Sequence, residues 1–180
     1  MILKKILLLT LLLLCVILIS IGNITGCAKE TKKMIYTGPG MNETLQNGDV
    51  LTISLLPYTP KHGDIVAIRL PEYDEPLISR IIAVGGQTID FDFENWIIYV
   101  DGEIIDEPYM LYQPDLPMYK YDIKPDMLPI KIEPGKIFVL GDNRDRALDS
   151  RTENIGQINV ELIIGNMIDI EYKIDDAVLE

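Results

Sequence analysis

The sequence has little of the chemistry that binds metals or forms disulfide frameworks. It contains one histidine and two cysteines, Cys15 and Cys27, and no CxxC pair. Zinc sites need several Cys, His or carboxylate ligands, so we exclude a zinc enzyme. One cysteine lies inside an apolar run and the other just after it, which does not fit a disulfide framework. We therefore predict no metal and no other cofactor.

Basic residues are also in deficit, with 16 Lys and Arg against 28 Asp and Glu and a net charge of −12. The first 33 residues carry +4, so the remaining 147 carry −16. A surface that acidic repels phosphate backbones, which excludes nucleic acid as a partner. The length of 180 residues and a 48% hydrophobic content predict one folded domain with a short appendage.

The appendage is an apolar segment near the N-terminus. Residues 6–22 carry no charge and follow Lys4 and Lys5, as in a secretory signal or a signal anchor. As a helix these residues span about 26 Å, just short of the hydrocarbon core of a membrane. Two anchors stay open for the segment 1–27: a retained helix, or a cleaved segment, because residues 24–27 resemble the lipobox of bacterial lipoproteins and make Cys27 a candidate for lipidation. Either anchor predicts a domain at 28–180 on the outer face of a cytoplasmic membrane.

The pattern after residue 33 is typical of β-structure. Short runs rich in β-branched residues alternate with turn dipeptides such as Asn47-Gly48, and Asp101-Gly102 predicts a tight hairpin. The expected strands lie in 50–56, 64–70, 79–86, 96–105, 136–141 and 162–172. Residues 142–150 are expected to allow a short helix or 3₁₀ turn. The fold class is therefore mainly β.

A proline- and tyrosine-rich segment interrupts these strands. Six of the 11 Pro and four of the nine Tyr lie between residues 108 and 134. We expect an irregular insertion over 106–134, because proline disfavours regular strands. It is either a structural cap or a contact surface for a partner.

The densest polar segment is 141–151, which holds three Asp, three Arg and one Asn directly after an apolar strand. Asp and Asn bond nearby backbone N–H groups, and Arg pairs with carboxylates, so this turn can support itself. A solvated, ion-paired loop has the same composition.

The order of residues in this turn, Gly-Asp-Asn-Arg-Asp followed by Asp-Ser-Arg and Ile-Gly-Gln-Ile, resembles the last motif of the bacterial type I signal peptidases. Further motifs of that family follow one another in the expected order. They are Met41 with Thr44 and Leu45, Asn47-Gly48-Asp49-Val50, Gly63-Asp64-Ile65-Val66, Arg80-Ile81-Ile82 with Gly85-Gly86, Tyr99-Val100-Asp101-Gly102 and Glu107-Pro108-Tyr109. The resemblance implies a curved β-sheet or barrel with an inserted cap. It also implies an extracytoplasmic serine endopeptidase that removes signal peptides.

The positions that carry catalysis in the family lack its side chains here. The family uses a serine nucleophile and a buried, neutral lysine as its base. The nucleophile position is Gly40, the base position is Ser79, the oxyanion position is Gly38 and the base-orienting position is Ala147, while Glu43 replaces a motif proline. The framework of the site remains as Met41, Arg80, Asp142, Asn143, Arg144, Asp149, Ser150 and Arg151. This resemblance implies that Asp149 and Arg151 form a structural ion pair.

The sequence thus predicts a catalytically degenerate, membrane-attached member that binds extended peptides of secreted or pilin-like precursors. Degenerate relatives in Gram-positive bacteria are associated with pilus biogenesis, which favours such partners. Two alternatives remain. One is an active signal peptidase that uses a relocated hydroxyl, such as Ser79 or Thr37. The other is a surface interaction domain without a peptide groove.

Overall fold

The computed structural model describes residues 30–42, 44–110 and 122–173, so the predicted membrane segment, Cys27 and Glu43 lie outside the described residues. The strands are β1 (Thr31–Ile35), β2 (Val50–Ser54), β3 (Ile65–Ile68), β4 (Leu77–Val84), β5 (Thr88–Asp92), β6 (Ile97–Val100), β7 (Glu103–Ile104), β8 (Ile130–Lys131), β9 (Lys136–Leu140), β10 (Ile158–Asn159) and β11 (Ile163–Glu171). Two 3₁₀ helices, η1 (Pro125–Met127) and η2 (Val160–Leu162), complete the described elements. Within these described ranges, no helix has the length and apolar character needed to cross a membrane.

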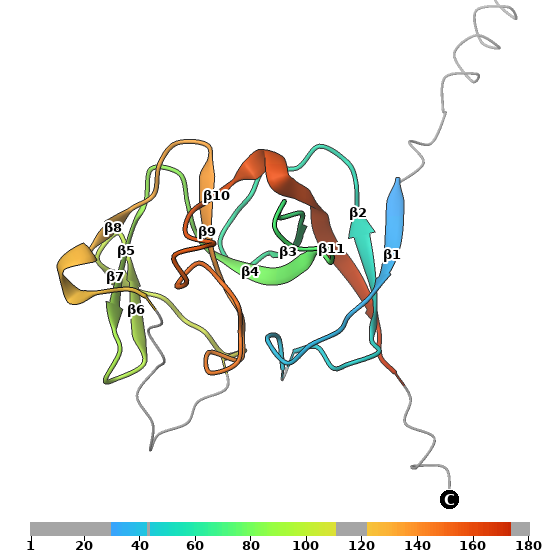
Figure 1. The fold of residues 1–180 in the computed structure, drawn as a ribbon, viewed down its shortest axis with the longest axis horizontal. Coiled ribbons are helices and arrows are strands. Elements are labelled where there is room, and N and C mark those ends of the chain that lie inside the picture. Colours follow the sequence, from blue (N-terminus) through green and yellow to red (C-terminus); the bar gives the residue numbers. More distant parts are fainter. Residues whose placement is uncertain (1–29, 43, 111–121, 174–180) are drawn as a thin grey trace, which may run out of the picture.

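The larger sheet has seven strands in the order β1-β2-β11-β3-β4-β9-β10, and all its neighbouring strands are antiparallel. It curls into a half-barrel (Figure 1). β11 pairs with β2 through one half and with β3 through the other, with register shifts at 163/165 and 167/169 that bend it. A Cβ on Gly165 would lie 2.0 Å from the carbonyl oxygen of Ser54, so the strands meet this closely only because residue 165 is glycine.

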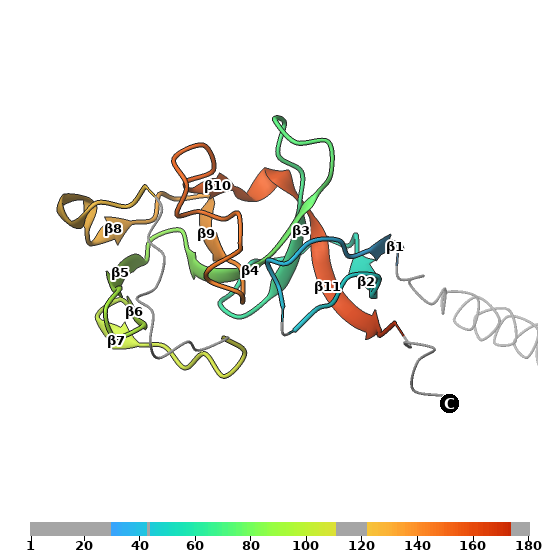
Figure 2. The same ribbon diagram turned by 60° about the horizontal axis from the view of Figure 1, so that its bottom comes forward.

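The smaller sheet has four strands in the order β7-β6-β5-β8 and lies beside the β9 end of the larger one (Figures 1 and 2). Asp101 and Gly102 connect β6 to β7 with φ values of 54° and 83°, as a two-residue hairpin requires. β8 belongs to the predicted insertion at 106–134 and pairs with β5. The end of that insertion therefore returns to the sheet, and residues 111–121 lie outside the described part.

Three apolar clusters fill the molecule. One packs the smaller sheet against β4 and β9, through side chains such as Ile82, Phe91 and Phe138. The others cover the two faces of β3, with Ile65 and Ala67 on one and Val66 and Ile68 on the other. The first of these two faces also buries three side chains of the loop between β1 and β2, which fixes that loop against the sheet. They are Tyr36, Met41 and Leu45.

The six predicted runs all contain strands, and the hairpin is confirmed. The prediction missed β1, β5, β8 and β10. No helix forms at 142–150, which consists of bends and turns, but the Arg146 amide donates to the Asn143 carbonyl at 3.2 Å, the i to i+3 hydrogen bond of the expected 3₁₀ turn. Elsewhere in the segment polar side chains bond its own backbone.

Candidate active site

The loop between β1 and β2 meets the polar turn after β9 at Gly40. The Gly40 carbonyl accepts a hydrogen bond from the Asn143 amide at 3.0 Å. A Cβ on Gly40 would lie 3.3 Å from the Ala147 Cα and 3.4 Å from its Cβ. A Cβ on Gly141 would lie 2.2 Å from the Ala147 Cβ and 2.4 Å from the Gly40 oxygen. The structure thus brings the predicted nucleophile and base-orienting positions together, and the contact requires glycine at 141.

The other two predicted catalytic positions lie in different surroundings. Ser79 lies in β4 opposite Val66 and is 1% exposed, and its hydroxyl has no hydrogen-bond partner among the described residues. Gly38 donates its amide to the Asn47 side chain at 2.8 Å and has a φ of 114°. A serine at position 38 would be strained at that φ. A side chain is therefore accommodated more easily at the predicted base position than at the predicted oxyanion position.

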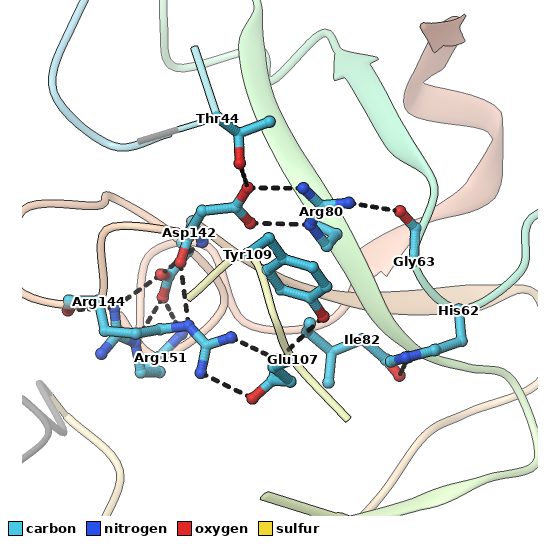
Figure 3. A network of polar contacts seen from close by, with 12 residues as sticks. Thr44, His62, Gly63, Arg80, Ile82, Glu107, Tyr109, Asp142, Arg144 and Arg151 are labelled. Atoms are coloured by element: carbon cyan, nitrogen blue, oxygen red, sulfur yellow. Dashed lines mark hydrogen bonds and ion pairs between the residues drawn. The ribbon is translucent and has the colours of Figure 1, made fainter. Parts of the chain in front are cut away.

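Arg80, the residue after Ser79, is held by a bidentate ion pair. Its Nε and Nη2 donate to the two oxygens of Asp142 at 2.8 and 2.6 Å, and its Nη1 donates to the Gly63 carbonyl at 2.8 Å (Figure 3). The hydroxyl of Thr44 donates to Asp142 from the other side. The ring of Tyr109 lies 3.7 Å from the Arg80 guanidinium carbon, a cation–π arrangement. This cluster joins β4 to the polar turn.

A second ion pair connects the start of the predicted insertion to the same turn. Arg144 pairs with both oxygens of Glu107 and donates its Nε to the Gly141 carbonyl at 3.0 Å (Figure 3). The Tyr109 hydroxyl donates to Glu107 at 3.1 Å. Burial, followed by the negative charge of Glu107, raises the pKa of Tyr109. Arg144 and Glu107 are almost fully buried, so the pair is protected from solvent.

The predicted ion pair between Asp149 and Arg151 is confirmed, and both side chains are fully buried. Arg151 donates Nε and Nη2 to the two Asp149 oxygens at 2.9 and 2.8 Å, and Nη2 also reaches the Arg144 carbonyl at 2.7 Å. The Gly141 amide donates to Asp149 at 3.1 Å. Ser150 accepts a hydrogen bond from a β9 amide at 3.0 Å. The composition of the polar turn was equally compatible with a solvated, ion-paired loop. The burial of this ion pair excludes that alternative.

A groove of about 190 Å³ lies next to Gly40. It is lined by three parts of the chain: residues 34–40, residues 75–78, and Gly141 with residues 146–148 of the polar turn. β1 is the edge of the larger sheet, and the pairing of β4 with β9 begins only at Arg80. The first two lining segments therefore each include strand residues with one edge on which no further strand pairs within the described chain.

The described residues hold no group of three or more His, Cys, Asp or Glu side chains placed to bind a metal ion. His62 is exposed, and its ring nitrogen lies 2.9 Å from the carbonyl oxygen of Ile82 (Figure 3). Thr37 lines the groove. The chemistry available at the groove is therefore hydrogen bonding by the backbone and by the hydroxyl of Thr37, together with the charges of Glu75 and Arg146.

Comparison with known proteins decides the family of this chain. The sequence matches the family described as signal peptidase, peptidase S26, over residues 3–170. The chain belongs to the signal peptidase family. A probable signal peptidase I-1 of Synechocystis is 34% identical over 121 residues, and signal peptidase I of Bacillus licheniformis is 31% identical over 135. The alignments cover 61% and 73% of this chain, and 56% and 71% of those relatives.

The crystal structure of a signal peptidase I from Enterococcus faecalis V583 has the same fold. It matches with a TM-score of 0.51 and 23% identity, over 62% of this chain and 98% of that one. The signal peptidase I fold predicted from the motifs is thereby confirmed. Sequence reasoning missed that Thr44, Glu107 and Tyr109 belong to the site. Their presence in two of the quoted motifs was the available clue.

Proposed function

We propose that this protein is a non-catalytic member of the signal peptidase family that holds extended segments of exported precursor proteins. The proposal depends on one observation, that Gly40 and Ser79 occupy the positions at which the family carries its serine and its lysine. We expect the domain to face the outside of a cytoplasmic membrane, anchored by the helix or by lipidated Cys27.

The chemistry of the family supports the loss of activity. A serine nucleophile needs a base within hydrogen-bond reach, and here the groove-lining residues that the structure describes include no Ser, Lys or His. Loss of a nucleophile or of its base typically lowers the rate by about 10⁶-fold in serine proteases. Backbone donors and binding alone would then remain.

Binding does not need those side chains. An extended peptide can add to strand edges through main-chain hydrogen bonds, while pockets select its side chains. The groove beside β1 and the start of β4 is suited to such a segment, because Gly40 and Ala147, which help to line it, present little side-chain bulk. Small side chains of a bound peptide would fit there.

A cleavage assay tests the proposal. The full-length protein in detergent micelles is incubated with a precursor that carries an Ala-x-Ala site, and we expect no cleavage above a buffer control. A serine-directed acylating inhibitor should also fail to label it. Specific cleavage that disappears in Ser79→Ala would support the active-enzyme alternative instead.

A gain-of-function variant tests whether the groove persists. It combines Gly40→Ser, Ser79→Lys and Ala147→Ser, and leaves Gly38 unchanged because of its positive φ. The contacts of 3.3 and 3.4 Å at Gly40 require its neighbour to move by a few tenths of an ångström. Even slow cleavage would show that the groove is intact. A folded variant that neither binds nor cuts such peptides would favour the interaction-domain alternative.

A further inference from the structure

The polar turn contains one arginine that the framework does not use. Arg144 and Arg151 are buried and paired with Glu107 and Asp149. Arg146 is exposed, lines the groove beside Ala147, and makes no ion pair or side-chain hydrogen bond among the described residues. Its positive charge is therefore available to a bound molecule.

An acidic residue also lines the groove. Glu75 is exposed in the bend before β4 and is likewise without an ion pair within the described part of the chain. Ala147, the neighbour of Arg146, packs on Gly141, which follows the β9 residue opposite Arg80. Glu75 and Arg80 are five residues apart, or up to about 16 Å of extended chain. The register thus places the backbone of Arg146 near the Arg80 end of this chain segment and Glu75 at its start, so the two charges lie at different positions along the groove.

We propose that this pair of charges sets the specificity and direction of the bound segment. The groove selects a peptide with an acidic side chain near Arg146 and a basic side chain near Glu75, up to about five residues apart, on either side of small residues. This inference rests on the proposed peptide-binding function. One exposed ion pair changes a Kd by up to about fivefold. The preference should fade at about 1 M salt, where the Debye length is about 3 Å.

The test measures fluorescence anisotropy with the full-length protein in non-ionic micelles. Three labelled peptides with blocked ends share a centre of small residues. One has Asp before Lys, one has Lys before Asp with the same spacing, and one has Asn and Gln instead. We expect one charge order to bind several-fold more tightly than the neutral peptide and the reverse order to bind more weakly.

Charge variants assign that preference to the two residues. In Arg146→Glu both charged side chains of the pair, at positions 75 and 146, are acidic, so the peptides with the two charge orders should bind equally. The double variant Arg146→Glu with Glu75→Arg keeps the net charge and should reverse the preferred order. Arg69→Glu is the matched control, because Arg69 is exposed but does not line the groove.

The possible outcomes distinguish a failure of the inferred charge selectivity from a failure of the proposed peptide binding. Equal binding of both orders by the unaltered protein, or a preference that the double variant does not reverse, would overturn the inference and leave peptide binding intact. If none of the three peptides binds, the proposed function itself is refuted.

Discussion

Asp149→Asn should strongly destabilise the domain, because it removes the buried carboxylate that pairs with the Arg151 guanidinium. The substitution keeps the size of the side chain, so it tests the charge and not the packing. In the native structure both Asp149 oxygens are used, by the Arg151 guanidinium and by the amides of Gly141 and Arg151. With both side chains fully buried, solvent cannot replace the lost partner.

The expected loss follows from that burial. Removing one member of a buried ion pair typically costs about 3–5 kcal/mol. A domain of this size has a total stability of about 5–15 kcal/mol, so the variant would lose a large share of it. At about 2–4 °C per kcal/mol, the melting temperature should fall by roughly 6–20 °C.

The single tryptophan provides the assay. Trp96 is 6% exposed and packs in the cluster between the two sheets, so its fluorescence reports the unfolding of the domain. The control is Glu171→Gln, which breaks the exposed pair with Lys33, whose side chains are 61% and 55% exposed. That control should cost well below about 1 kcal/mol. Similar melting temperatures for the two variants would refute the reasoning.

Three further predictions concern other parts of the molecule. Gly141→Ala should lower the melting temperature markedly, because its Cβ would lie 2.2 Å from the Ala147 Cβ. Tyr109→Phe should reduce the loss of unfolding free energy at high pH. The pKa of Tyr109 is raised on folding, so the contribution of its hydroxyl to that free energy is complete below about pH 10 and falls above it. Melting temperatures at pH 9 and 11 measure this effect, and equal slopes would contradict it. If Cys27 is lipidated, the mature protein should begin at that residue with acyl chains, and Cys27→Ser should abolish processing; intact mass decides.

Strands could be predicted where apolar runs are bounded by turn residues. The prediction failed where the strands carry few apolar residues. β1 reads Thr-Lys-Lys-Met-Ile and is mostly exposed, since it is a sheet edge and edges tolerate lysine. β8 and β10 have two residues each, too few for a period. β5 does alternate between partly buried and buried positions, so its pattern was present and overlooked.

At the site, local pairs were predictable and distant pairs were not. Asp149 and Arg151 are two residues apart, so their pairing could be inferred from the motif. Arg80 and Asp142 are 62 residues apart, and the chain has 28 carboxylates from which to choose. Only the pairing of β4 with β9 brings these two together.

The buried ion pairs of the framework do not depend on the side chains at positions 40 and 79. The three buried ion pairs join β4, the polar turn and the segment at Glu107, and they involve neither Gly40 nor the side chain of Ser79. A lysine at position 79 would have to be buried at a cost to its charged form, which serine avoids. The same scaffold can therefore hold the segments that line the groove in place with or without a catalytic pair.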